Sequence, residues 1–255
     1  MSSLRVRDLR KRFGTVEAVR GVDLDLLPGE TLALVGESGS GKSTIARLVL
    51  QLIAPDCGSI ELDGQSLIGL RGDALRAMRR RLQMIFQDPY GSLDPTLSIR
   101  QVLTEPFRVH FHRRPSQDEL ERLMGDVGLS AALLDRMPHE LSGGQRQRVA
   151  IARALAVQPE FIACDEVVSA LDVSTRAQIL TLLRSLQRSR SLSMLFITHD
   201  LAIVPYIARR VAVIYRGEIV ERGVVDEIFS RPQHAYTQAL LAAVPVPDPR
   251  LRDAA

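Results

Sequence analysis

A glycine-rich stretch constrains this 255-residue chain more than any other feature of its sequence. The stretch reads Gly36-Glu37-Ser38-Gly39-Ser40-Gly41-Lys42-Ser43-Thr44 and fits the pattern G-x-x-x-x-G-K-[ST]. A strand-like apolar run, Thr31 to Val35, precedes it, and a helix-like run, Thr44 to Ile53, follows it. Glycines leave backbone N–H groups free to surround a phosphate, and the N-terminus of the following helix attracts an anion. The sequence therefore predicts a nucleotide-phosphate site between a strand and a helix.

The polar residues of this loop have predicted roles. Lys42 supplies a point charge to the terminal phosphates, and the Ser43 hydroxyl ligates Mg²⁺. The alternative is an ordinary glycine-rich turn, which the flanking strand and helix disfavour. The predicted nucleotide-binding set in the loop is Gly36, Ser38, Gly39, Ser40, Gly41, Lys42, Ser43 and Thr44.

A second candidate site element is an apolar run, Phe161 to Cys164, that ends in two acids. The first acid, Asp165, is suited to hold Mg²⁺, and the second, Glu166, to position or deprotonate an attacking water. The alternative is a plain strand followed by a solvated acidic turn, but the position downstream of the glycine-rich loop favours catalysis. Cys164 lies inside the strand pattern, so we expect it to be a small core residue rather than a reactive thiol.

Strand-like and helix-like runs alternate along much of the chain, which predicts an α/β fold with a mainly parallel sheet. We expect a P-loop core with an antiparallel β subdomain (residues 1–87 and 157–230), a helical subdomain inserted at about 88–156, and a C-terminal tail at 231–255 that frays beyond Pro245. Strands are expected at Leu4–Asp8, Val19–Leu27, Thr31–Val35, around Ile60–Gly64, and at Phe161–Cys164, Met194–Thr198 and Val211–Tyr215. Helices are expected over most of Asp73–Ala156 and at Thr175–Arg188.

The composition excludes several classes of protein. No apolar run approaches the roughly 20 residues that cross a bilayer, and the N-terminus lacks the apolar core of a signal peptide. We therefore expect a cytoplasmic chain that reaches a membrane only through a partner. The net charge is +3, and we interpret the basic cluster Arg76, Arg79, Arg80 and Arg81 as a solvated helix face rather than a nucleic-acid site.

Cysteines and the remaining histidines indicate no further metal site. Cys57 and Cys164 are too few and too isolated for a disulfide framework or a Cys-rich metal site. His110 and His112 lie between two prolines without other ligands, so the sequence predicts a surface loop there.

A further motif, Leu141-Ser142-Gly143-Gly144-Gln145, precedes a helix-forming run over residues 146–156. It matches the signature sequence of the ABC (ATP-binding cassette) ATPases, and with the loop and the acid pair it makes this chain similar to that family over nearly its whole length. Four more motifs follow the family's order: Phe13 resembles the aromatic residue that stacks on adenine, Gln87 the Q-loop glutamine, Ser169–Asp172 the D-loop, and His199 the switch histidine.

This resemblance implies an ATPase that binds ATP and Mg²⁺. It implies Glu166, His199 and Gln87 as catalytic residues, and Ser43, Gln87 and Asp165 around the metal. It also implies that Ser142, Gly143, Gly144 and Gln145 meet the γ-phosphate of an ATP held by a second cassette. Hydrolysis would then require a head-to-tail dimer, with the chain itself or with a paralogue.

Two other stretches, Phe86–Pro95 and Pro232–Pro245, resemble the dipeptide/oligopeptide/nickel importer branch of this family. The resemblance implies a motor on the cytoplasmic face of the inner membrane. Its partners would be integral permease subunits and, indirectly, an extracytoplasmic substrate-binding protein. Peptide is the favoured cargo, with nickel or another chelated metal as the alternative. A soluble ABC-type ATPase acting on nucleic acid is less favoured, since no DNA-reading domain is evident, and Glu166 and His199 argue against a non-hydrolysing regulator.

The chain departs from its branch at two places. Val167 stands where relatives usually have proline after the acid pair, and valine neither restricts the backbone nor removes an N–H there. Some peptide-importer members carry a cysteine cluster in the tail, whereas this tail has none, so we expect no iron–sulfur site.

Overall fold

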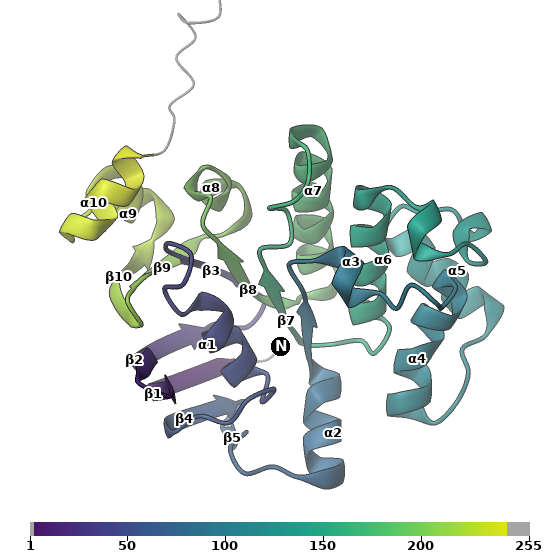
Figure 1. The fold of residues 1–255 in the computed structure, drawn as a ribbon, viewed down its shortest axis with the longest axis horizontal. Helices are drawn as coiled ribbons and strands as arrows, with labels where there is room; N and C mark the ends of the chain where they lie inside the picture. The colour runs from purple at the N-terminus through teal and green to yellow at the C-terminus, as the bar shows by residue number, and fades with distance from the viewer. Residues whose placement is uncertain (1–2, 244–255) are drawn as a thin grey trace, which may run out of the picture.

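The computed structural model describes residues 3–243, which form two β-sheets flanked by helices (Figure 1). In chain order the elements are β1 (Leu4–Phe13), β2 (Val16–Leu26), β3 (Thr31–Val35), α1 (Lys42–Val49), β4 (Cys57–Leu62), β5 (Gln65–Ser66), α2 (Gly72–Arg81), β6 (Leu82–Ile85), α3 (Pro89–Ser92), α4 (Ile99–Phe111), α5 (Gln117–Asp126), α6 (Gly143–Leu155), β7 (Phe161–Asp165), α7 (Val173–Arg190), β8 (Ser193–Thr198), α8 (Val204–Ile207), β9 (Arg210–Tyr215), β10 (Glu218–Val224), α9 (Val225–Ser230) and α10 (Ala235–Ala242). Short 3₁₀ turns lie at Ala131–Leu133, Pro138–Glu140 and Leu201–Ile203.

The larger sheet has the strand order β10-β9-β3-β8-β7-β6. All its neighbouring strands run parallel except β10, which is antiparallel to β9. Every residue of β3, β7 and β8 is buried, as expected for parallel strands covered on both faces. The carboxyl ends of β3, β6, β7 and β8 therefore meet at one edge of this sheet, where the candidate site residues follow.

The smaller sheet is antiparallel, with the order β2-β1-β4-β5. Its inward side chains pack with α1 and one face of the larger sheet in a single apolar cluster, which includes Leu9, Leu34, Ile45 and Phe161. The opposite face of the larger sheet packs against α4 to α7 in a second cluster. The predicted α/β class, with a mainly parallel sheet, an antiparallel β unit and a helical region, is confirmed.

A helical unit lies between β6 and β7 in the chain and on the right of Figure 1. Its helices begin with polar caps: Ser98, Ser116 and Ser142 each form a capping box, with Gln101, Glu119 and Gln145 respectively. Such caps satisfy backbone N–H groups that a helix leaves unpaired. Within residues 3–243, no helix is both long and apolar enough to span a bilayer.

Three secondary-structure predictions need correction or addition. The stretch predicted as largely helical contains the strand β6. Its four residues are too few to show a strand pattern in the sequence, and its hydrogen bonds come from pairing with β7. The predicted surface loop at His110 is wrong, because α4 continues through Pro106 to Phe111 and His110 lies in its last turn. Strand β10 and helices α8, α9 and α10 were not predicted. The predicted fraying beyond Pro245 falls outside the described residues.

Candidate functional site

The glycine-rich loop joins β3 to α1 and is packed tightly against two other strands. A Cβ atom on Gly36 would lie 2.3 Å from the carbonyl oxygen of Ile214 in β9. A Cβ atom on Gly41, whose φ is 109°, would lie 2.5 Å from the carbonyl oxygen of Ala18 in β2. Only glycine fits at these two positions, because any side chain would collide with backbone. The loop therefore packs between β2 and β9, and its amides lie at the N-terminus of α1.

Lys42 lies almost wholly inside this loop, with a relative exposure of 4%. Its Nζ donates to the carbonyl oxygens of Gly36 (2.8 Å) and Glu37 (2.7 Å). Burial lowers the pKa of Lys42 below its ordinary value, and the carboxylates of Glu166 and Asp165 oppose that shift. The ammonium group is thus a desolvated cation held by two neutral carbonyls, which makes it ready to pair with an anion.

Ser43 and Asp165 meet where α1 begins and β7 ends. The Ser43 hydroxyl donates to Oδ1 of Asp165 at 2.9 Å. Asp165 is 4% exposed, and its burial raises the pKa of the carboxyl group, although the bond from Ser43 opposes that shift. Two adjacent oxygen donors, one of them a buried carboxyl group, fit a hard divalent cation such as Mg²⁺. The other predicted ligand, Gln87, is hydrogen-bonded to Glu166 instead.

Glu166, Gln87 and His199 converge just beyond the carboxyl ends of the neighbouring strands β7, β6 and β8. Gln87 Nε2 donates to Oε2 of Glu166 at 3.1 Å, and Nδ1 of His199 lies 3.2 Å from the same oxygen. The Glu166 side chain is largely buried, whereas that of His199 is half exposed. Glu166 has a left-handed backbone (φ 48°), and its N–H donates to the carbonyl of Ile197 at 3.0 Å. A carboxylate oriented in this way can serve as a general base toward water.

Phe13 closes the β1–β2 hairpin, where it is paired with Val16. Its ring is 49% exposed, and Lys11 Nζ lies 5.6 Å from the ring centroid. The partner strand β2 carries Ala18, which packs against the loop at Gly41. The exposed aromatic face of Phe13 is available to stack on a planar base.

The signature residues lie apart from the glycine-rich loop within the chain. Figure 1 places α6, which begins at Gly143, in the helical layer on the right and α1 on the left. Ser142 caps α6 by accepting from the Gln145 N–H. A Cβ atom on Gly144 would lie 2.5 Å from Cγ2 of Thr175 in α7. A side chain at position 144 would therefore force the Thr175 side chain to move, so glycine there favours close packing of α6 on α7.

The D-loop residue Asp172 has a structural role that its sequence pattern did not reveal. It caps α7, since its carboxylate accepts from the Thr175 N–H at 3.0 Å and from the Ser174 hydroxyl at 2.7 Å. These bonds lower the pKa of Asp172 well below its usual range. Val167, which follows Glu166, is buried. Cys164 is fully buried, which raises the pKa of its thiol to about 12 and confirms that it is an unreactive core residue.

Two contacts to the loop were not predicted from the sequence. Gly217 N–H, in the β9–β10 turn, donates to the Ser40 carbonyl at 3.0 Å. Tyr236 in α10 accepts from the Glu37 N–H at 3.0 Å. The run Pro232–Pro245 drew attention only as a resemblance to one branch, and no local pattern indicates that it reaches residue 37.

Two family models match this sequence. The model described as "ABC transporter" matches residues 19–169, and the model described as "Oligopeptide/dipeptide transporter, C-terminal region" matches residues 220–255. The second match covers the strand and helices that bring Tyr236 to the loop.

Curated relatives and solved structures are similar along most of the chain. The probable peptide ABC transporter ATP-binding protein y4tS of Sinorhizobium fredii is 52% identical, over 92% of this chain and 67% of that protein. The oligopeptide transport ATP-binding protein OppF of Escherichia coli is 50% identical over 93% and 72%, and the glutathione import ATP-binding protein GsiA of E. coli is 51% identical over 96% and 42%. The cassette MJ0796 in a dimeric, post-hydrolysis state with ADP and Pi has a TM-score of 0.78 at 28% identity, covering 87% of this chain and 98% of that one.

Proposed function

Because this chain belongs to the ABC transporter family of ATP-binding subunits, we propose that it hydrolyses Mg²⁺-bound ATP to drive the import of peptides through a separate permease. The match of residues 220–255 to the oligopeptide/dipeptide transporter C-terminal region carries the choice of cargo. Peptide-like cargo also agrees with the oligopeptide and glutathione import functions in the names of the relatives.

The proposed reaction uses the geometry of the sheet edge. Lys42 exchanges the carbonyls of Gly36 and Glu37 for the β- and γ-phosphates, and the loop amides complete the phosphate contacts. Ser43, Asp165 and Gln87 would hold Mg²⁺, which would neutralise phosphate charge at this site. Phe13 stacks on the adenine.

Glu166 then accepts a proton from the attacking water, and His199 contacts the γ-phosphate from the neighbouring strand.

A second cassette completes each site in this proposal. Ser142, Gly143, Gly144 and Gln145 form the N-terminus of α6, a helix that lies in a different part of the molecule from α1 (Figure 1). Backbone N–H groups at a helix N-terminus attract an anion, so this end suits the γ-phosphate on an opposing subunit. The partner is a paralogue or a second copy of the chain, and both assemble on the cytoplasmic face of the membrane.

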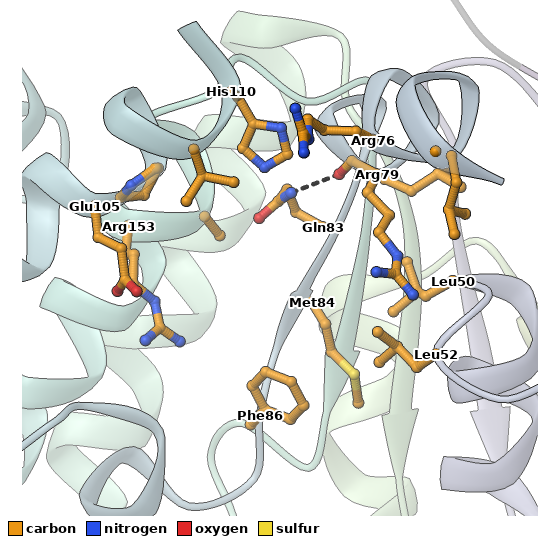
Figure 2. Close-up of a pocket in the computed structure, with 16 residues that line it drawn as sticks. Leu50, Leu52, Arg76, Arg79, Gln83, Met84, Phe86, Glu105, His110 and Arg153 are labelled. Carbon is orange, nitrogen blue, oxygen red and sulfur yellow. Dashed lines mark hydrogen bonds between the residues drawn. The ribbon is translucent and has the colours of Figure 1, made fainter. Parts of the chain in front are cut away.

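A groove between the core and the helical unit is the proposed docking site for the permease (Figure 2). Its volume is about 500 Å³. Leu50, Leu52, Met84 and Phe86 line one side with apolar surface. Phe86 directly precedes Gln87 in the chain. The remaining lining includes the basic residues Arg76, Arg79 and Arg153. An amphipathic cytoplasmic helix of the permease that carries acidic residues fits this combination of apolar surface and positive charge.

Replacing Val109 with arginine should block this docking. Val109 lies on α4 inside the groove and is 47% exposed, so the longer side chain fills the groove without disturbing the core. We expect at least tenfold weaker association with the permease and a matching loss of uptake, with ATP binding by the isolated chain unchanged. Leu27→Arg, at an equally exposed leucine outside the groove, is the matched control. Normal uptake in the Val109 variant would exclude the groove as the docking site.

The cargo is tested by uptake of labelled dipeptide, glutathione, a longer peptide and nickel, in cells that carry the wild-type chain or Glu166→Gln. The proposal predicts that Glu166→Gln abolishes uptake of at least one peptide and leaves nickel uptake intact. Loss of nickel uptake alone would move the chain to metal import. If all four uptakes persist, the importer proposal for these cargoes is wrong.

A further inference from the structure

The C-terminal helix reaches the phosphate-binding loop through a single hydroxyl group. The N–H of Glu37 donates to Oη of Tyr236 at 3.0 Å, across 199 residues of sequence. The carbonyl oxygen of the same Glu37 accepts from Lys42 Nζ at 2.7 Å. Both polar backbone groups of residue 37 are therefore held, one by the lysine that is proposed to bind phosphate and one by α10.

The edge of the large sheet fixes the position of α10. The carboxylate of Glu221 in β10 accepts from the N–H groups of Gln233 (2.8 Å) and His234 (3.1 Å), just ahead of the helix. His234 then caps α10, because its Nδ1 accepts from the Tyr236 N–H at 3.2 Å. Thr237 is buried against the rest of the chain. Tyr236 therefore lies in a first helical turn that Glu221 and His234 hold in place, and this fixes the position of its hydroxyl group.

The ring of Tyr236 is supported as well. It packs on the ring of Tyr215, at the end of β9, with centroids 4.2 Å apart and planes inclined by 32°. Two residues farther on, Gly217 N–H donates to the carbonyl of Ser40 at 3.0 Å. Figure 1 shows α9 and α10 beside β9 and β10 at the left of the molecule. The helix α10 and the β9–β10 turn therefore hold the loop at two points, Glu37 and Ser40.

We propose that Tyr236 is a positioning residue that keeps the phosphate-binding loop in its binding conformation before a nucleotide arrives. This proposal rests on the proposed phosphate-binding role of the loop. When Lys42 turns to the phosphates it must release the carbonyls of Gly36 and Glu37, whereas the bond to Tyr236 uses the other face of the Glu37 backbone. The bond to Tyr236 therefore persists when Lys42 moves from the carbonyls to the phosphates. Because the loop is already ordered, nucleotide binding does not lose free energy in ordering it.

The substitution Tyr236→Phe tests this role, because it keeps the ring on Tyr215 and removes only the acceptor. We expect the Kd values for ATP and for ADP to rise together by roughly 3- to 10-fold, the usual effect of one neutral hydrogen bond. The kcat at saturating ATP should stay within about twofold of wild type, because the hydroxyl does not touch the reacting atoms. Hydrogen exchange at the Glu37 amide should become faster in the nucleotide-free protein. Tyr206→Phe, which loses a bond to Thr181 in another part of the chain, should change none of these values.

A double-substitution cycle identifies the bond itself. Glu37→Pro removes the N–H that Tyr236 accepts from, so adding Tyr236→Phe to it should leave nucleotide affinity unchanged. The same several-fold loss in that background would overturn the proposal, as would wild-type affinity in the single Tyr236→Phe variant. The variant Lys42→Met tests the proposed phosphate site separately from the role of Tyr236. If it binds ATP as well as wild type, the proposed site is wrong; if it loses ATP while Tyr236→Phe does not, only the role of Tyr236 is wrong.

Discussion

Replacing Glu166 with glutamine is expected to lower the kcat of ATP hydrolysis by about 10²–10⁴-fold, the usual effect of losing a positioned acid–base group. Glutamine has the same shape, and its side-chain oxygen can still accept the bond from Gln87 Nε2. The amide cannot accept a proton from water, so ATP should still bind but should not be hydrolysed at an appreciable rate. Phosphate release by the assembled dimer, beside equilibrium ATP binding, measures the two effects separately.

The same variant should accumulate as an ATP-bound dimer, because hydrolysis is the step that would let the two cassettes separate. Size-exclusion chromatography with and without ATP detects this species. Glu61→Gln is the matched control, since Glu61 lies in β4 of the smaller sheet and should leave both turnover and oligomeric state unchanged. A fall in kcat of less than tenfold for Glu166→Gln would remove Glu166 from the role of general base.

The three side chains that converge at the edge of the large sheet were predictable because each is part of a local motif. Gln87, Glu166 and His199 follow short strands, and β6, β7 and β8 are neighbours in the sheet, so their ends bring the three side chains together. The order of the strands was not predictable from local patterns. It depends on which apolar faces cover each other, and β6 in particular is a strand only because β7 lies beside it.

Contacts that join distant segments could not be predicted. The family resemblance assigns Gly144 to contact with a γ-phosphate, and its close approach to Thr175 gives a separate reason for a small residue there. Tyr236 belongs to a run that indicated only a branch of the family, because hydrogen bonding across 199 residues leaves no periodic signal in sequence. The sequence predicts a loop at His110 because it lies between two prolines, whereas α4 accommodates the first of them, Pro106.

Replacing Lys42 with methionine should raise the Kd for ATP strongly while changing the free energy of unfolding only slightly. Charge-assisted hydrogen bonds contribute about 1.5–3 kcal/mol each. Losing the ammonium group should therefore raise the Kd for ATP by roughly 10²-fold or more. Isothermal titration with ATP measures this loss, and ADP should be affected in the same direction because its β-phosphate uses the same charge.

The free energy of unfolding should respond in a different way. Lys42 is a buried cation whose pKa is lowered chiefly by desolvation, and removing a buried charge relieves that cost. The carbonyls of Gly36 and Glu37 lose their donor in exchange, so we expect the nucleotide-free protein to change in stability by less than about 1 kcal/mol. Urea unfolding of the variant checks this value, with Arg100→Met as the matched cation control; breaking the Arg100–Asp135 pair in the helical unit should leave ATP affinity nearly intact. If Lys42→Met instead unfolded the protein, the lysine would be a structural bridge of the loop, and its loss of ATP binding would say nothing about phosphate contact.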